Sequence, residues 1–502
     1  MKFSELLQGL GVQHRGGDPE ISGLDYDSRR VQPGWLFVAM RGEASDGNGY
    51  IDAAIQKGAV AVVTDSSSES QRQGIGWAVA PHGRKALAGL AANFYDRPAG
   101  KLKITGITGT NGKTTTTFLT EAILKFGGKP SALIGTIEYH VAGKLLPAPH
   151  TTPESLELNQ IFSDAVATGA TDAVMEVSSH ALEQGRVWGI PYAVAVFTNL
   201  TRDHLDYHTD MQSYFAAKSM LFQGSGVPPP STAVINADDP YGQVLLKVSY
   251  GISKQVISYG IEKGDFRATD VDLQPHGTSF RLVTPAGSIP LRSQLIGRIN
   301  IYNLLAASAA SWARGCSLEQ IASAVAGFSQ VPGRFERVDC GQPFTVVVDY
   351  AHTDDALRNL TAIARDFISR SGADGRVITV FGCGGDRDRT KRPLMGEAAG
   401  MGSDFVVVTS DNPRSEDPLR IIDDILPGLK RSGPGKYMVE PDRQKAITLA
   451  LTEARHGDMV LVAGKGHEKT QTTREGVFPF DDVQVVRKQL QQMESVAQRG
   501  TE

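Results

Sequence analysis

Short apolar runs that end in polar or glycine-rich clusters recur along most of the chain. In the first half they are KLKITGIT (101–108), TDAVMEVSSH (171–180), YAVAVFTNL (192–200) and STAVINADDP (231–240). The second half repeats the pattern in FTVVVDYAH (344–352), RVITVFGCGGDRD (376–388), DFVVVTSDNPR (404–414) and DMVLVAGKGHE (458–468). Helical patterns occupy most of the gaps between these runs. Alternating strands and helices predict an α/β fold with doubly wound, mostly parallel sheets.

The length of the chain and two loop-like stretches suggest its division into domains. A chain of 502 residues is too long for one hydrophobic core, because domains usually hold about 100–200 residues. YDRPAGKLK (95–103) and SQVPGRFERVDCGQP (329–343) separate regions of different pattern. The sequence therefore predicts three domains, at residues 1–98, 99–332 and 333–502.

Composition narrows the class of protein. The net charge of −4 and the pI of about 6.3 argue against a partner that is nucleic acid or a membrane surface. No apolar run approaches the ~20 residues that span a bilayer, and the N-terminal stretch is too polar for a signal peptide. The cysteines, at positions 316, 340 and 383, lack metal-ligand spacing, so neither a disulfide framework nor a zinc site is expected. We expect a cytoplasmic protein and, given the linkers, a monomer with mobile domains.

Candidate chemistry lies just past the predicted strands, at the edge where open α/β sheets bind ligands. TGTNGKTTT (108–116) resembles a phosphate-binding loop, in which backbone N–H groups and a helix N-terminus surround the phosphates. Lys113 would neutralise phosphate charge, and the Thr114 hydroxyl would reach Mg²⁺. The glycines at 106, 109 and 112 depart from the common GxxxxGK[ST] form. In this strand–loop–helix setting the loop predicts nucleotide binding.

Two further strand ends carry polar clusters. Glu176 and Ser178 follow one strand in MEVSSH. The Glu176 carboxylate would suit Mg²⁺. The alternative is that the serines do no more than cap the helix that follows. The segment TNLTRDHLDYH (198–208) crowds four polar side chains into one strand-end loop, which favours a site: Asp203, His204, Asp206 and His208.

One lysine falls on an otherwise apolar helix face. In DMQSYFAAKSMLF (210–222) this face carries Met211, Tyr214, Phe215, Lys218 and Phe222. The lysine could extend its ammonium group to solvent. Otherwise it needs a partner or altered chemistry, because an unpaired buried ammonium is costly. A depressed pKa would make the amine nucleophilic, and its reaction with CO₂ would give a carbamate that can bind a metal.

Two later segments add candidates for nucleotide contacts. GRINIYNLLAASAA (297–310) places Asn300 and Asn303 on a helix of small residues, where plain helix packing is the alternative. VPGRFERV and VVVDYAHTDDAL supply Arg334, Asp349 and His352 beside a domain boundary. These three residues could hold the base or ribose of a nucleotide, or they could form an interdomain salt bridge.

A series of motifs occurs in an order that is similar to one known family. They are GTNGKTT, EVSSH, NLTRDHLDYH with the AAK lysine, GRxNxxN, PGRFE, DYAHT, GCGGDRD, DNPR and GKGHE, and they span essentially the whole chain. On these residues the chain resembles the ATP-dependent Mur ligases, in particular the members that add the third residue of the peptidoglycan stem peptide. The resemblance implies a UDP-binding N-terminal domain, a central ATPase domain and a C-terminal Rossmann-like domain. It also implies that ATP phosphorylates the γ-carboxylate of D-glutamate and that an amine then attacks the acyl phosphate.

The resemblance assigns roles to individual positions, with ATP as a substrate and Mg²⁺ as the cofactor. The residues expected to be catalytic are Lys113, Glu176, His204 and Lys218. The expected metal ligands are Thr114, Glu176, His204 and carbamylated Lys218. The expected ATP contacts are Gly109, Thr110, Asn111, Gly112, Lys113, Thr114, Thr115, Asn300, Arg334 and Asp349. The expected contacts of UDP-N-acetylmuramoyl-L-alanyl-D-glutamate are Tyr26, Ser28, Glu43, Ala44, Ser45, His150, Thr151, Thr152, Ser178, Gln184 and Arg186. Two positions depart from the family pattern: Asp354 stands where proline is usual, and His150 where asparagine is common.

The DNPR motif bears on which amino acid is added. By the resemblance, the incoming amino acid would contact Arg387, Asp411, Asn412, Pro413, Arg414, Gly464 and Glu468. The planar guanidinium of Arg414 suits a carboxylate, which meso-diaminopimelate carries at its far end and L-lysine lacks. An unpaired arginine in a closed site would discriminate against L-lysine by up to about 10⁴-fold. The interpretation is a ligase for meso-diaminopimelate. The alternatives are the same ligase using L-lysine, a folylpolyglutamate synthase, and a P-loop switch or regulatory ATPase without ligase chemistry.

Overall fold

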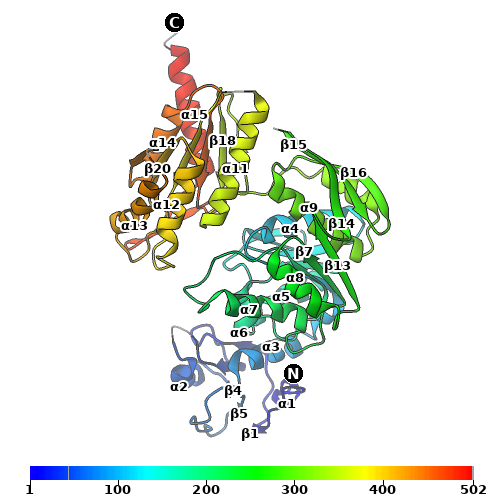
Figure 1. The fold of residues 1–502 in the computed structure, drawn as a ribbon. Helices are drawn as coiled ribbons and strands as arrows, with labels where there is room; N and C mark the ends of the chain where they lie inside the picture. The colour runs from blue at the N-terminus through cyan, green and yellow to red at the C-terminus, as the bar shows by residue number, and fades with distance from the viewer. Residues whose placement is uncertain (43–44, 275, 373, 434, 500–502) are drawn as a thin grey trace.

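Three bodies, each built around its own β-sheet, follow one another along the chain (Figure 1). The computed structural model describes residues 1–42, 45–274, 276–372, 374–433 and 435–499. In Figure 1 the N-terminal body lies at the bottom, the central body in the middle and the C-terminal body at the upper left. Each of the three large sheets falls within one of the predicted segments, while the exact domain boundaries stay a prediction.

The N-terminal body carries a five-stranded sheet in the order β1-β5-β4-β3-β2. Its strands are β1 (His14–Arg15), β2 (Gly23–Asp25), β3 (Trp35–Ala39), β4 (Ala61–Thr64) and β5 (Gly76–Val79). Its helices are α1 (Phe3–Leu6), α2 (Ile51–Gln56) and α3 (Gly83–Phe94), with 3₁₀ turns η1 (Gly47–Tyr50) and η2 (Pro98–Lys101). Strands β2 to β5 pair in parallel, and β1 adds one antiparallel edge.

The central body is built on an eleven-stranded sheet, with β6 (Lys103–Thr108) between β10 (Asp172–Glu176) and β11 (Tyr192–Phe197). On the β11 side follow β12 (Thr232–Asn236), β13 (Gln255–Gly260), β14 (Phe266–Gln274), β15 (Gly277–Thr284) and β16 (Gly287–Ser293). On the β10 side follow β7 (Ser131–Ile134), β8 (Glu138–Val141) and β9 (Lys144–Pro147). Its helices are α4 (Lys113–Phe126), α5 (Ser155–Ala167), α6 (Ser179–Gln184), α7 (Met211–Gln223), α8 (Pro240–Ser249), α9 (Arg298–Ala313) and α10 (Leu318–Ala326).

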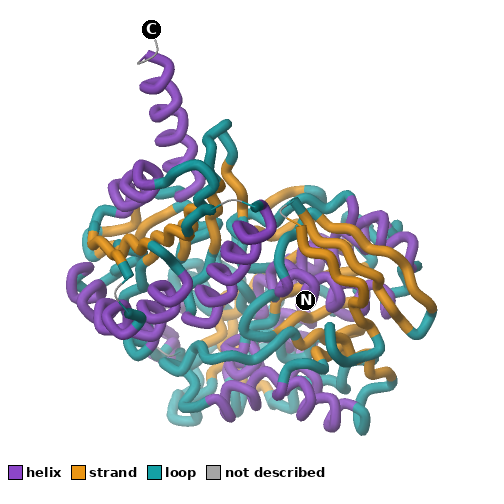
Figure 2. Tube along the Cα trace, turned by 45° about the horizontal axis from the view of Figure 1, so that its top comes forward, coloured by secondary structure: helices purple, strands orange, loops and turns teal. Residues whose placement is uncertain are grey.

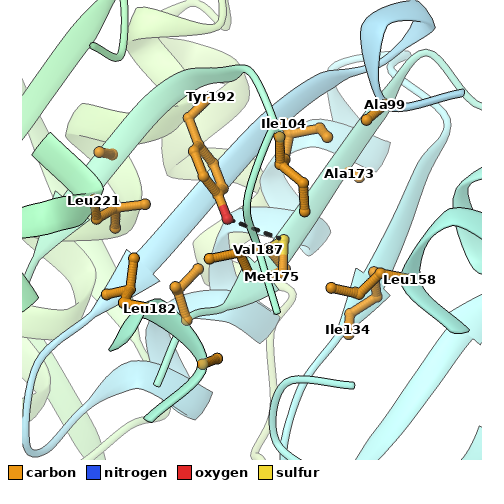
Figure 3. Close-up of a cluster of buried hydrophobic side chains, with 14 of the residues drawn as sticks. Ala99, Ile104, Ile134, Leu158, Ala173, Met175, Leu182, Val187, Tyr192 and Leu221 are labelled. Atoms are coloured by element: carbon orange, nitrogen blue, oxygen red, sulfur yellow. Dashed lines mark hydrogen bonds between the residues drawn. The ribbon is translucent and has the colours of Figure 1, made fainter. Parts of the chain in front are cut away.

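Alternation of side chains along the central strands gives this sheet two apolar faces. Ala173 and Met175 belong to one buried cluster, whereas Val174 between them belongs to the cluster on the other face. Helices cover both faces, which is why these strands are almost uninterrupted apolar runs in the sequence. Figure 3 draws the first cluster, in which the Tyr192 hydroxyl donates to Met175 Sδ at 3.8 Å. Packing on both faces therefore holds in position the strands whose ends carry the polar clusters.

The C-terminal body carries a six-stranded sheet in the order β17-β18-β22-β19-β20-β21 and a separate two-stranded ribbon. The strands are β17 (Glu336–Val338), β18 (Thr345–Asp349), β19 (Val377–Phe381), β20 (Phe405–Val408), β21 (Lys436–Val439), β22 (Met459–Ala463), β23 (Thr470–Thr473) and β24 (Gly476–Pro479). The helices are α11 (Asp354–Ser371), α12 (Lys391–Gly402), α13 (Pro418–Arg431), α14 (Arg443–Glu453) and α15 (Asp482–Arg499). The end of α15 projects from the body in both overall views (Figures 1 and 2).

The α/β fold with mostly parallel sheets is confirmed, but the sequence did not predict two antiparallel additions. Strands β14 to β16 pair antiparallel on one side of the central sheet, and the hairpin β8–β9 pairs antiparallel on the other. Their alternating, half-exposed residues give a weaker signal than the buried parallel strands. Among the described residues, no helix is long and apolar enough to cross a membrane.

Candidate active site

A cavity of about 500 Å³ brings together most of the predicted site residues of the central and C-terminal bodies. Its walls come from the loops after β6, β10, β11, β18 and β19 and from α7 and α9. The predicted residues that line it are Thr110, Asn111, Gly112, Lys113, Thr114, Thr115, His150, Thr151, Thr152, Glu176, Ser178, Gln184, Arg186, His204, Lys218, Asn300, Arg334, Asp349 and Arg387. Parallel strands end at one edge of a sheet, and this geometry gathers residues that are far apart in sequence.

The loop between β6 and α4 has the backbone of a phosphate-binding loop. Gly112, which precedes the first residue of α4, adopts φ +84°, and Gly109 adopts φ +149°. A Cβ at Gly109 would overlap the Thr198 hydroxyl, and one at Gly112 would overlap Asn303. Lys113 donates through Nζ to the carbonyl oxygens of Gly109 (3.0 Å) and Thr110 (2.9 Å). Both glycines are therefore required by the tight turn that aims the N-terminus of α4 at the cavity.

The Thr114 hydroxyl and the Glu176 carboxylate meet at the start of α4 and the end of β10. Thr114 Oγ1 donates to Glu176 Oε2 at 3.1 Å. Thr136, which follows β7, donates its backbone N–H to Oε1 (2.8 Å) and its hydroxyl to Oε2 (3.0 Å). Glu176 is fully buried, so these donors fix its carboxylate beside the phosphate-binding loop. Thr136 was not among the residues predicted from the sequence, because a threonine after a strand is too common to be a signal.

Lys218 is buried rather than extended to solvent, with 2% of the residue exposed. Its Nζ donates to the Gly109 carbonyl at 2.9 Å and lies 4.5 Å from the centroid of the Tyr214 ring. Burial and the nearby ammonium group of Lys113 lower the pKa of Lys218 well below its ordinary value, although the charge of Asp203 acts in the opposite direction. The amine is thus favoured in its neutral form, which is the form that reacts with CO₂.

The oxygen atoms around the cavity are ligands of the kind that Mg²⁺ prefers, but there are few of them. Glu176 and Thr114 offer oxygen atoms, which Mg²⁺ prefers. Within the described part of the chain, no three His, Cys, Asp or Glu side chains gather closely enough to hold a metal ion. A metal here would need further oxygen ligands, which phosphate groups and a carbamate on Lys218 can provide.

The predicted nucleotide contacts on α9 and in the C-terminal body reach the same cavity. Arg334 donates from Nη2 to Thr114 Oγ1 at 3.1 Å, and its guanidinium lies 4.6 Å from the Tyr350 ring centroid. Asn303 donates to Asn300 Oδ1 at 2.9 Å. Asp349 accepts backbone N–H groups from Phe335 (2.6 Å) and Ala351 (2.8 Å), and burial raises its pKa despite the charge of Arg334. Among the described residues Asp349 forms no salt bridge, whereas His352 lies 3.9 Å from Asp203 of the central body, so the interdomain contact that the sequence left open is made by His352.

The histidine-rich loop after β11 divides into two parts. Asp203 lies between His204 (3.4 Å) and His352 (3.9 Å) of the C-terminal body. Burial alone would raise the pKa of Asp203, but these rings and Lys391 lower it. His208 is buried away from the cavity and contacts Ser179 Oγ through Nε2 at 2.9 Å. Asp206, which is exposed, does not line the cavity.

The residues predicted for the sugar-peptide form one hydrogen-bonded group. The Thr152 hydroxyl donates to the Glu176 carbonyl (2.9 Å) and accepts from the Ser178 N–H (3.1 Å). Arg186 donates to Gln184 Oε1 (2.9 Å) and to the Thr152 carbonyl (3.1 Å). Thr151 Oγ1 contacts Thr136 Oγ1 at 3.1 Å. The side chain of His150, at one of the two departures from the family pattern, is exposed at the mouth of this group.

The residues predicted for the UDP part lie apart from the cavity. Tyr26 donates through its hydroxyl to Glu157 Oε1 at 3.0 Å, which joins the N-terminal body to α5 of the central body. Ser28 lies in the turn that follows β2, and Ser45 is exposed in the segment after β3. Positions 43 and 44 lie outside the described residues. These assignments stay predictions.

The residues predicted for the amino acid lie in loops after β19, β20 and β22. Arg414 adopts φ +53° and donates from Nη1 to the Gly385 carbonyl at 2.8 Å. Arg387 donates to the Asp386 carbonyl at 2.9 Å. Burial and the charge of Arg387 lower the pKa of Arg414. Among the described residues, no carboxylate lies within 4.0 Å of either guanidinium. Asp411, Asn412 and Pro413 are buried, and Gly464 and Glu468 face them from the loop after β22.

The other departure from the family pattern fits the helix that follows. Asp354 is the first residue of α11, and Thr353 caps that helix by accepting the Ala356 N–H at 3.1 Å. Proline and aspartate are both favoured at a first helical position, the latter by the helix dipole. The next residue was missed: Asp355 accepts from Asn111 of the phosphate-binding loop at 2.8 Å. In the sequence, only the two consecutive aspartates of HTDD could have indicated that Asp355 has a role.

The fold and the cavity are those of a nucleotide-binding α/β enzyme. Polar residues of the central body and of the C-terminal body line the cavity around its phosphate-binding loop. Family comparison matches residues 20–95 to the Mur ligase family catalytic domain, 107–311 to the Mur ligase middle domain and 333–466 to the Mur ligase glutamate ligase domain. The chain belongs to the Mur ligase family and is a ligase of that family.

Individual relatives extend this similarity over nearly the whole chain. The chain is 52% identical, over 94% of both chains, to a protein of Solibacter usitatus named UDP-N-acetylmuramoyl-L-alanyl-D-glutamate--2,6-diaminopimelate ligase. It is 47% identical, over 97% of this chain and 99% of the relative, to a protein of the same name from Geobacillus thermodenitrificans. A solved structure with that name is 34% identical, covers 94% of this chain and 95% of its own, and superposes with a TM-score of 0.66.

Proposed function

We propose that this chain uses ATP to join meso-diaminopimelate to the γ-carboxylate of D-glutamate in UDP-N-acetylmuramoyl-L-alanyl-D-glutamate, a step of peptidoglycan synthesis. The similarity to ligases that carry this name supports the reaction. The observation that carries the choice of amino acid is the pair of guanidinium groups of Arg387 and Arg414. Neither has a carboxylate partner among the described residues, so an anionic end of the substrate would supply one.

The residues around the cavity have distinct tasks in this reaction. The loop at Gly109–Lys113 would bind the phosphates, and Arg334 would approach the transferred group from the C-terminal body. Thr152, Gln184 and Arg186 would hold the sugar-peptide so that its carboxylate lies beside Glu176 and the start of α4. Phosphoryl transfer depends mainly on such positioning and on positive charge. The amine of the amino acid would then attack the acyl phosphate, and phosphate would leave.

Mg²⁺ belongs to the proposal as the cofactor. Thr114, Glu176, His204 and carbamylated Lys218 would hold it, and it would neutralise the charge that develops on the transferred phosphoryl group. The neutral amine that burial favours at Lys218 supports the carbamate. UDP would be bound by Tyr26, Ser28 and the segment at 43–45 of the N-terminal body.

The test measures phosphate release from ATP in the presence of UDP-N-acetylmuramoyl-L-alanyl-D-glutamate, with meso-diaminopimelate or L-lysine as the second substrate. Turnover with meso-diaminopimelate alone is expected. Arg414→Ala should weaken use of meso-diaminopimelate by roughly 10- to 100-fold and leave the KM of ATP unchanged. Turnover with L-lysine would support the ligase activity but contradict the role assigned to Arg414. Phosphate release that ignores both cosubstrates would favour the P-loop ATPase alternative.

A further inference from the structure

A buried lysine joins two of the loops that carry the predicted amino-acid contacts. Lys465 follows β22 in the GKGHE motif, and none of its side chain is exposed. Its Nζ donates to Glu468 Oε2 at 3.0 Å and to Asn412 Oδ1 at 3.1 Å, and it lies 3.7 Å from Asp411 Oδ1. An ammonium group has three protons and here faces three acceptors. Two of these protons are hydrogen-bonded to Glu468 and Asn412, and none of the side chain is exposed, so the effect of Lys465 on a substrate should pass through these partners.

The partners of Lys465 are themselves tied together. Asn412 donates from Nδ2 to Glu468 Oε2 at 2.8 Å and accepts from the Thr472 N–H at 2.9 Å through Oδ1. In the described residues the contacts to the carboxylate of Glu468 fall on Oε2, so Oε1 is left for a ligand. The side chain of Glu468 is 29% exposed, which makes this oxygen accessible. Lys465 and Asn412 thus fix the direction in which Glu468 presents its second oxygen.

Charge gives the lysine a second effect on the pocket. Asp411 and Glu468 approach the same ammonium group, and no other lysine or arginine of the described residues pairs with either carboxylate. Without that ammonium no cationic group would lie between the two carboxylates, and their mutual repulsion would favour their separation. The lysine thereby holds in place two carboxylates whose charges act on Arg414.

The backbone beneath these loops has a separate support. Arg443 of α14 forms a fully buried ion pair with Asp482 at 2.7 Å. It also donates to the carbonyl oxygens of Ser410 (3.4 Å) and Ala463 (3.0 Å), the residues that precede the DNPR and GKGHE loops. Because this support does not involve Lys465, loss of the lysine should move side chains of the pocket more than the fold.

We propose that Lys465 is a positioning residue for the amino-acid substrate, acting through Glu468 and Asn412. The inference rests on the proposed function, since it takes the loops after β20 and β22 as the place where meso-diaminopimelate binds. It assigns no catalytic step to the lysine. The lysine sets the affinity for the end of the amino acid, ammonium or carboxylate, that binds in this pocket. It does not affect the binding of ATP or of the sugar-peptide.

The experiment compares Lys465→Met with Lys469→Met by steady-state kinetics. Lys469 is four residues away on the same segment, but 61% of its side chain is exposed and it pairs with Asp481 at 2.8 Å. Lys465→Met is expected to raise the KM of meso-diaminopimelate by roughly 10- to 100-fold, with kcat within about threefold and the KM values of ATP and the sugar-peptide unchanged. Lys469→Met is expected to match the wild type.

A double variant separates positioning from a merely structural role. If Lys465 acts through Glu468, adding Lys465→Met to Glu468→Gln should raise the KM of meso-diaminopimelate little beyond the effect of Glu468→Gln alone. Lys465→Gln, which keeps a hydrogen-bond donor and removes the charge, repeats the test should Lys465→Met fail to fold.

Three results would decide against the proposal or its basis. An unchanged KM of meso-diaminopimelate in a folded Lys465→Met or Lys465→Gln variant overturns it. So does a variant whose melting temperature and active fraction fall while all three KM values stay the same, since that marks a structural role only. Failure of the wild type to use meso-diaminopimelate would instead refute the proposed function.

Discussion

At the scale of single residues, the chemistry depends on charged groups that the fold places out of water. Lys218 illustrates this, because the sequence could not distinguish a solvent-extended lysine from a buried one. In the structure its amine lies under the phosphate-binding loop, and burial together with Lys113 lowers its pKa. A buried amine whose pKa is lowered fits the proposed carbamate better than a permanent cation does.

Replacing Lys218 by alanine is expected to lower ligase activity by at least about 10²-fold, because the carbamate that would help to hold Mg²⁺ is lost. Short carboxylic acids such as formate or acetate should restore part of the activity, since a free carboxylate can take the place of the carbamate. Phosphate release measures both effects. Lys247→Ala, at an exposed position of α8, is the control. If no acid restores a folded Lys218→Ala variant, the carbamate is refuted.

At the scale of elements, the site depends on how strands and helices begin and end. The turn between β6 and α4 needs glycine at Gly112, where φ is +84° and a side chain would overlap Asn303 of α9. The β8–β9 hairpin is held to α4 in a different way. His140 of β8 contacts Glu121 of α4 at 2.8 Å and Glu138 at 3.0 Å, and Lys125 also pairs with Glu121.

Gly112→Ala is expected to cost about 1–2 kcal/mol of stability, from the left-handed backbone and the overlap together. It should also weaken ATP binding, since the turn that aims α4 at the phosphates would shift. Thermal unfolding and calorimetric titration with ATP measure the two effects. Gly100→Ala, where a Cβ would meet nothing within 4 Å, is the matched control. An ATP affinity equal to that of the wild type would contradict the role given to the turn.

His140 makes the stability of the hairpin depend on pH. Burial acts to lower the pKa of His140, but its hydrogen bonds and attraction to Glu121, with help from Glu138, outweigh burial and raise it. A folded-state pKa above the unfolded value of about 6.5 stabilises the fold below pH 6.5, and this stabilisation is lost as pH rises through the folded-state pKa. His140→Gln should therefore lower the melting temperature at pH 6 and have little effect at pH 9. An equal effect at both pH values would exclude this linkage.

At the scale of the whole molecule, the cavity lies between the central and C-terminal bodies, and residues of both bodies line it. Asp355 of α11 accepts from Asn111 of the phosphate-binding loop at 2.8 Å and from the Thr201 hydroxyl at 3.3 Å. Arg202 contacts Thr390 and lies 3.6 Å from Asp388. These contacts join loops of two separate sheets, so the position of one body is linked to the loop that would bind ATP.

Asp355→Ala is expected to loosen this junction. Loss of the two hydrogen bonds to Asn111 and Thr201, each of about 1 kcal/mol, should raise the KM of ATP roughly 5- to 30-fold, and the radius of gyration from small-angle scattering should increase. Glu397→Ala is the control, because Glu397 lies on α12 and pairs with Arg431 of the same body. Unchanged scattering and ATP kinetics would mean that Asp355 does not hold the bodies together.

The sequence by itself determined the features that are written in local pattern. Uninterrupted apolar runs gave the parallel strands, because both faces of those strands are buried. Glycine positions and the following threonines gave the phosphate-binding loop, because few other residues permit that turn. Ordered motifs gave the family, and polar clusters after strands gave most of the residues that line the cavity.

Only the tertiary structure decided what depends on neighbours from distant parts of the chain. The burial of Lys218, the contacts of Thr136 with Glu176 and of Asp355 with Asn111, and the enclosure of Lys465 join residues from different strands or bodies. The antiparallel strands β14 to β16 and the hairpin β8–β9 likewise follow from pairing partners that their half-exposed sequences do not specify. Burial and charge pairing are properties of the packed whole, so local pattern could name the candidate residues but could not tell which of them meet.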